Sequence, residues 1–211
     1  MEPAVYQSRL MAAMACAGRE RHAALLALHQ AALTAYVDAV MHITAEQAAK
    51  PVPVAGDART LAQIVGHIAA WDRFSILSAG DMLAGVVHPR AVKETNGYVD
   101  ADGTVLNFDD VDGFNAWAAD ADSRRTWAEI QASAVQAART FYGLLAHDEL
   151  LSADRLEQTA LHKKTLGDGT VMEDLPMGWV LWLLQIEHIA VSHAAELGLD
   201  EAKAPVIQED D

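Results

Sequence analysis

Four long stretches of this chain carry apolar residues at the spacing of an α-helix, and this pattern limits the possible folds more than any other feature. The stretches cover residues 6–47, 60–83, 124–145 and 176–197. No run alternates apolar and polar side chains convincingly, as a half-buried β-strand does. The sequence therefore predicts an all-α protein built as a bundle of four long helices.

Local signals place the ends of these helices. Pro51 ends the first, because proline lacks the N–H donor that a continuing helix needs. Thr60 and Gln63 form the pattern of a capping box at the start of the second, in which each side chain satisfies an open backbone donor. Pro176 opens the fourth helix and Gly198 ends it.

Length and composition favour one domain. The chain has 211 residues, and 52% of them are hydrophobic, which is ample for a core. We expect a single domain over residues 1–211, with its core at about 16–200 and an acidic tail at 201–211. The segment 85–113 is rich in glycine and aspartate and is long for a connection inside a compact domain. It is expected to cover a cleft between the helices.

Charge limits the partners of the protein. Thirty acidic and 15 basic residues give a formal net charge of −15, which repels phosphate backbones and anionic lipid headgroups. Nucleic acid and membrane surfaces are therefore poor partners. The one cysteine, Cys16, cannot form an internal disulfide. Because the apolar run Leu10–Ala17 is also too short to span a bilayer, we expect a soluble protein in the cytoplasm.

Histidines occur in two of the apolar helices. His67, Trp71 and Phe74 follow one another at spacings of four and three residues, so the histidine lies on the face with the large side chains. His188 lies in the apolar fourth helix. A buried imidazole is costly unless it has a partner. It is either a metal ligand or a core histidine bonded to a backbone carbonyl or a carboxylate. The sequence alone leaves both interpretations open.

Three stretches resemble the signatures of one family. Thr60–Asp72 is similar to the second-helix signature of the DinB-like superfamily of bacterial bundle proteins, Pro176–Leu197 to its last-helix signature, and Gly113–Trp117 to the segment before its third helix. The resemblance implies a four-helix bundle with a long crossover loop and an internal cleft that usually holds a divalent metal. Members of the family include thiol-dependent transferases and isomerases of the mycothiol and bacillithiol type, small-molecule hydrolases and stress-induced proteins.

The resemblance also assigns metal ligands by position. His67 matches the first ligand and His188 the second, but the third position, four residues later, is Ser192, and His193 follows it. Residues five apart on an ideal helix are separated by about 140°, against about 40° for residues four apart. A π-bulge would bring His193 into a site with His67 and His188. Without one, the site keeps two histidines with a serine or water and binds metal weakly.

Other side chains have two interpretations each. His22 and His29 share an apolar stripe on the first helix and could reach the cleft or belong to the core. His193 could lie at the rim of the protein, near the end of its helix. Glu187 or Asp72 could act as an acid or base, or could be a solvated helix charge.

Two classes of function remain. In the first, zinc, nickel or iron polarises a low-molecular-weight thiol or a small electrophile, with Trp71 and Ser192 as candidate substrate-binding residues. In the second, a non-catalytic bundle binds a small ligand or a partner, and its metal site is degenerate. The histidines at 67 and 188 favour the first class, and Ser192 favours the second. A homodimer is expected in either case, because family members frequently pair an apolar bundle face with another subunit.

Overall fold

The structure is a computed structural model, and it describes residues 3–52, 59–90, 97–100, 102–147, 149–165 and 171–199. Helices dominate it, which confirms the all-α prediction. The expectation that the chain has no strands is wrong, because two short antiparallel hairpins are present. The elements in chain order are α1 (Pro3–Ala15), α2 (Gly18–His42), α3 (Ala45–Ala48), α4 (Leu61–Leu83), β1 (Tyr98–Val99), β2 (Val105–Leu106), α5 (Val111–Ala121), α6 (Trp127–Ala146), α7 (Ala153–Glu157), β3 (Leu161–Thr165), β4 (Val171–Pro176), α8 (Met177–Glu187) and a π-helical turn, η1 (His188–Ser192).

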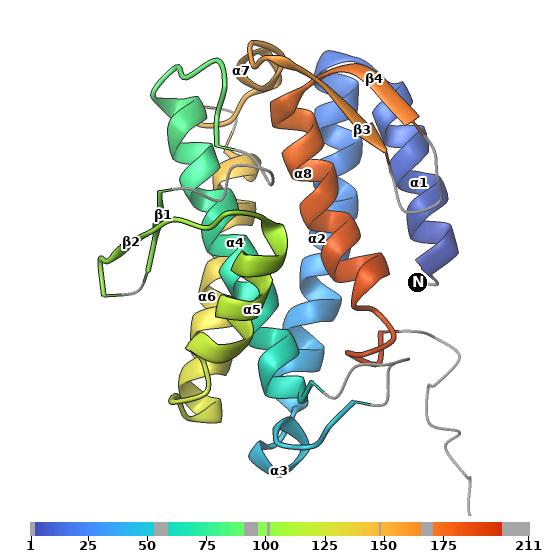
Figure 1. The fold of residues 1–211 in the computed structure, drawn as a ribbon. Helices are drawn as coiled ribbons and strands as arrows, with labels where there is room; N and C mark the ends of the chain where they lie inside the picture. The colour runs from blue at the N-terminus through green and yellow to red at the C-terminus, as the bar shows by residue number, and fades with distance from the viewer. Residues whose placement is uncertain are drawn as a thin grey trace, which may run out of the picture.

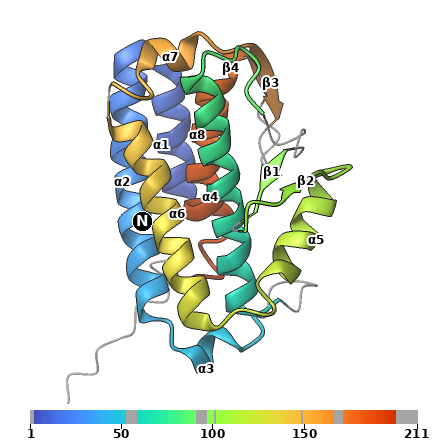
Figure 2. The same cartoon turned by 90° about the vertical axis from the view of Figure 1, so that its left-hand side faces the viewer.

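The long helices α2, α4, α6 and α8 lie side by side along one direction, and α1 covers α2 and α8 from outside (Figures 1 and 2). The most extensive helix pair is α4 with α6. The short helix α3 lies at one end of the molecule, and α7 and the β3–β4 hairpin lie at the other (Figure 1). Helix α8 is buried on nearly every side, as its apolar sequence predicts.

The prediction of one continuous helix over residues 6–47 is wrong. Residues 6–47 divide into three helices, and the first break is at Gly18, whose φ of +50° suits glycine far better than other residues. The chain turns there, so that α1 packs on α2 and buries Tyr6, Leu10 and Met14. By length and composition α2 could cross a membrane, a test that buried helices of soluble proteins also pass.

Helix α4 begins and ends where the sequence predicts. Thr60 accepts a hydrogen bond from the backbone N–H of Gln63, and the Gln63 side chain accepts one from the backbone N–H of Thr60. A second capping box, formed by Thr126 and Glu129, starts α6. The two helices that pack most extensively on each other therefore have fixed first turns.

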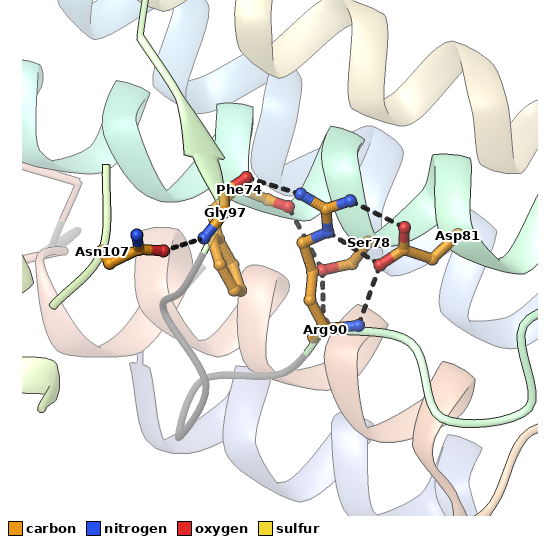
Figure 3. A network of polar contacts seen from close by, with 6 residues as sticks. All are labelled: Phe74, Ser78, Asp81, Arg90, Gly97 and Asn107. Carbon is orange, nitrogen blue, oxygen red and sulfur yellow. Dashed lines mark hydrogen bonds and ion pairs between the residues drawn. The ribbon is translucent and has the colours of Figure 1, made fainter. Parts of the chain in front are cut away.

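The segment after α4 is tied back to that helix by Arg90 (Figure 3). Its guanidinium binds both carboxylate oxygens of Asp81 at 2.7 and 2.8 Å and donates to the backbone carbonyl of Gly97 at 2.7 Å. Ser78 donates to the carbonyl of Arg90 at 2.6 Å, and Asn107 accepts from the N–H of Gly97 at 2.9 Å. Arg90 therefore holds both the segment that leaves α4 and the segment that enters β1.

The predicted loop 85–113 is partly regular structure. Residues 91–96 and 101 lie outside the described part of the chain, but β1, β2 and the start of α5 fall within it. Tyr98 is buried against the ring of Phe114, and Phe114 packs on Trp71 of α4. The segment therefore lies against α4 through aromatic contacts, beside the helix turn that carries His67.

Close approach of the chain beside His67 depends on a glycine. A Cβ atom at Gly66 would lie 2.1 Å from the carboxylate of Asp122, which follows α5. Asp122 is held in place by Arg125 at 2.7 Å. The end of α5 can therefore pack directly on α4 only because residue 66 has no side chain.

Candidate metal centre

Three histidine rings converge between α4 and the end of α8. The Nε2 atom of His188 lies 3.1 Å from Nε2 of His67 and 3.0 Å from Nε2 of His193. One ligand atom from each histidine lies within 4.8 Å of the others. His67 and His193 are buried, and His188 is half-buried. Residues from opposite parts of the chain therefore offer three ring nitrogens to one point.

The π-helical turn solves the problem of the five-residue spacing. The backbone N–H of His193 bonds the carbonyl of His188 at 3.1 Å, five residues back instead of four. One extra residue enters the turn, and His193 rotates onto the face that His188 occupies. His193 is 7% exposed and is not a rim residue. Ser192, at the position where the family places its third ligand, is exposed and lies at the edge of the adjoining cavity.

Two of the three separations between the ring nitrogens suit a small divalent ion, and the third is within 4.8 Å. Nitrogen ligands at 2.0–2.1 Å from a tetrahedral zinc ion lie about 3.3 Å apart. The observed Nε2 separations are close to that value. If His193 carries its proton on Nδ1, its Nε2 presents a lone pair toward His188, and a cation between the rings offsets the repulsion between lone pairs. These three histidines could therefore form a metal site.

An acidic residue outside the triad fixes the orientation of His193. Glu196 accepts the hydrogen bond of Nδ1 of His193, and its other oxygen lies 3.7 Å from the guanidinium of Arg59. The Glu196 side chain is only 6% exposed. A carboxylate on Nδ1 is the usual partner of a metal-binding histidine, because it holds the Nε2 lone pair toward the ion. Sequence reasoning missed Glu196, although its three-residue spacing from His193 is a helical one.

Burial keeps the three rings neutral. It lowers the pKa of His67 from 6.5 to about 3, with further lowering by the charges of His193 and Arg59. Burial also lowers the pKa of His188 well below its usual value, and neighbouring histidines add to the effect. The pKa of His193 is lowered by burial and partly restored by Glu196. Neutral imidazole is the form that binds metal.

A cavity of about 230 Å³ opens beside the triad. It is reached by the rings of His67 and His188, and Trp71 forms part of its wall. The indole N–H of Trp71 donates to the side-chain oxygen of Asn115 on α5 at 3.0 Å, so the segment between α4 and α6 supplies a cavity residue. Both predicted substrate-binding residues line this space. The full lining is His67, Trp71, Phe74, Ser75, Asn115, Leu181, Leu184, Gln185, Glu187, His188 and Ser192.

The structure places the other candidate histidines away from the triad. His22 is buried, with Nε2 3.1 Å from the carbonyl of Leu151. His29 is buried too, and its Nδ1 accepts a hydrogen bond from the indole of Trp182 at 3.1 Å. Burial lowers the pKa of His29 to about 3. The hypothesis that these two rings enter the cleft is wrong; both belong to the core.

The two acidic candidates differ in position. Glu187 lines the cavity beside His188. Asp72 is not a solvated helix charge, because it is 1% exposed and bonds the side-chain amide of Gln185. Neither fact was accessible from the sequence, since a carboxylate on an apolar helix is usually exposed.

Comparison with known proteins adds no family or function. No family model, no curated protein and no solved structure matches this chain.

Proposed function

We propose that this chain is a DinB-like four-helix bundle protein that holds a divalent metal ion and uses it on a small molecule. His67, His188 and His193 are the ligands in this proposal, with zinc, nickel or iron as the ion. The observation that carries the proposal is the π-turn, because it brings His193 within 3.0 Å of His188 and supplies the third ligand. Two further observations support the proposal. Three stretches of the sequence resemble DinB-like signatures, and the helices α2, α4, α6 and α8 lie side by side with their axes aligned.

The donor set suits chemistry as well as binding. Three neutral imidazoles leave the positive charge of the ion uncompensated, and the cavity adjoins two of the three ligands, His67 and His188. A divalent ion bound there supplies Lewis acidity and lowers the pKa of a coordinated thiol or water. Catalytic zinc sites commonly have three protein ligands and one open position.

The cavity residues have separate roles. Trp71 and Phe74 offer apolar faces to a bound molecule. Ser192 and Glu187 offer polar groups next to His188, where Glu187 is the candidate acid or base. A cavity of this size suits a small thiol or a small electrophile. We propose thiol-dependent transfer or isomerisation, or hydrolysis, as the reaction class.

The second candidate is a non-catalytic bundle with a degenerate metal site. Ser192 at the expected ligand position favoured it in the sequence. The π-turn weakens it, because His193 takes over the position that Ser192 leaves. Location in the cytoplasm and assembly as a homodimer are also part of the proposal, and the mass in solution tests the dimer.

The experiment is an activity screen on protein stripped with chelator and reloaded with zinc, nickel or iron. Thiol transfer to electrophiles and hydrolysis of small esters and amides are measured with the wild type, with His188→Ala and with His29→Gln. The proposal expects activity in the reloaded wild type and in His29→Gln, and none in His188→Ala. A wild type that takes up no metal and is inactive in every assay would support the non-catalytic bundle with a degenerate metal site instead.

A further inference from the structure

A chain of side chains connects the cavity wall to the closed interior. Ser75 and Gln185 line the cavity, and the hydroxyl of Ser75 lies 3.2 Å from the side-chain oxygen of Gln185. The nitrogen of the same amide bonds one oxygen of Asp72. Asp72 itself does not reach the cavity. Gln185 therefore couples a buried carboxyl group to a hydroxyl in the candidate binding site.

Asp72 lacks the partners that a buried carboxylate needs. Its second oxygen is fully buried and has no hydrogen bond within the described structure. Arg73, the neighbouring cation on α4, bonds the hydroxyl of Tyr98 and the hydroxyl of Ser133 instead, each at 2.9 Å. An ionised carboxylate with one hydrogen bond in an apolar core is strongly disfavoured, and such a group takes up a proton.

Neither Tyr36 nor Gln185, which come from the helices beside α4, places a positive charge next to Asp72. Tyr36 on α2 is fully buried, and its hydroxyl, like the second oxygen of Asp72, has no hydrogen bond in the described structure. Gln185 on α8 is neutral. Burial raises the pKa of Asp72 well above its usual value, and only Arg73 and the Gln185 hydrogen bond oppose this. Burial and the charge of Asp72 also raise the pKa of Tyr36.

A proton on Asp72 makes a second arrangement of the hydrogen bonds between Asp72, Gln185 and Ser75 available. A carboxylate accepts from the Gln185 N–H, so the amide oxygen takes the proton of Ser75. A carboxylic acid has an O–H that a carboxylate lacks, and when this O–H donates to the amide oxygen, the amide is turned over and its N–H donates to Ser75. The two orientations have the same heavy-atom shape, because amide oxygen and nitrogen exchange places. In the second orientation the proton of Ser75 is free for a ligand.

We propose that Asp72 is a neutral acid in the folded protein and that, through Gln185, it presents the Ser75 hydroxyl as a hydrogen-bond donor to the molecule in the cavity. This inference rests on the proposed function, and it narrows the substrate to compounds with a hydrogen-bond acceptor, such as a carbonyl oxygen. Asp72 and Gln185 are positioning residues, and Ser75 is the residue that touches the substrate.

The side-chain amide signals of Gln185 test the hydrogen-bond directions. Protein labelled with ¹⁵N-glutamine is compared by NMR with Ser75→Ala and Asp72→Asn, and Gln185→Leu assigns the signals. We expect Ser75→Ala to shift the Gln185 N–H signals, because their acceptor is lost. We expect Asp72→Asn to leave the N–H signals near their wild-type positions, because the asparagine amide replaces the acid O–H as donor to Gln185.

The opposite result overturns the proposal. Gln185 signals that move in Asp72→Asn, or that stay in place in Ser75→Ala, mean that the Gln185 N–H donates to Asp72 and not to Ser75. Infrared difference spectra give an independent readout: wild type minus Asp72→Asn must contain the C=O band of a protonated carboxyl group. Zinc content, measured on the same samples, separates this inference from the proposed function. If none of these proteins contains zinc, the wild type included, the metal proposal is contradicted, but the result for the Gln185 amide still holds.

Discussion

Two groups of buried histidines occur in this molecule, and they differ in what their ring nitrogens meet. In the core, Nε2 of His22 meets a backbone carbonyl and Nδ1 of His29 meets an indole N–H. In the triad, the Nε2 atoms of His67 and His193 both meet Nε2 of His188. His22 and His29 each meet a group of the protein other than a histidine, as packing residues do. Nitrogens that face one another have an electrostatic reason to hold a cation.

Burial alone does not distinguish the two groups. His29 and His67 are both buried, and burial lowers the pKa of each to about 3. What differs is the group that each ring nitrogen faces, which depends on neighbours from distant parts of the chain. Substitutions in each group are therefore expected to have different effects on metal binding.

The largest effect is expected at the π-turn. His193→Ala removes the third ligand, and we expect metal binding to be lost, because two histidines with a serine or water hold zinc weakly. Ser192→Ala, the neighbouring control, is expected to keep wild-type metal content, since Ser192 is exposed and is not in the triad. Elemental analysis of both variants measures this. Normal metal in His193→Ala and loss in Ser192→Ala would place Ser192 in the ligand set.

A smaller effect is expected at Glu196. Glu196→Gln keeps a hydrogen-bond acceptor near Nδ1 of His193 but removes the negative charge. We expect zinc affinity to fall by about 10-fold to 100-fold, the usual cost of changing such a partner. Competition with a chromophoric chelator measures the dissociation constant. An unchanged constant would mean that the carboxylate of Glu196 does not orient His193 for a metal.

The smallest effect concerns the core group. Because the pKa of His29 is about 3 in the fold against 6.5 for a free histidine, the unfolded chain binds more protons between these pH values. Stability is therefore lost as pH falls from 6.5 toward 3. One such group contributes a slope of about 1.4 kcal/mol per pH unit.

The variant His29→Gln tests this slope. Glutamine keeps an acceptor for the indole N–H of Trp182 but does not titrate. We expect the free energy of unfolding of metal-free protein, measured with urea at several pH values, to depend less steeply on pH in the variant. Its metal content is expected to equal that of the wild type. Equal slopes in the two proteins would show that His29 is not held neutral.

Much of the helical architecture could be predicted from the sequence. The capping box at Thr60, the end of α4 at Leu83 and the apolar character of α8 all follow from short-range patterns. The break at Gly18 was missed, although a glycine with positive φ is a local stop signal, because apolar residues continue at helical spacing on both sides of it. The β1–β2 hairpin was also missed, since its strands have two residues each. The β3–β4 hairpin was missed because neither of its strands alternates apolar and polar residues.

The candidate site could be predicted as a set of alternatives. The spacing of His188 and His193 identified the π-turn as the condition for a three-histidine site, but no pattern in the sequence shows whether a helix takes that turn. The roles of Glu196, Gln185 and Asp72 depend on contacts between elements. Side-chain partners that are far apart in the sequence require the structure.

The central claim is that the three histidines hold one metal ion. Elemental analysis of untagged protein, purified without chelator, tests it directly when wild type and His67→Ala are compared. The proposal predicts near-stoichiometric zinc, nickel or iron in the wild type and its loss in a variant that still folds. A wild-type protein that is well folded and takes up no metal, even after incubation with these ions, would contradict it.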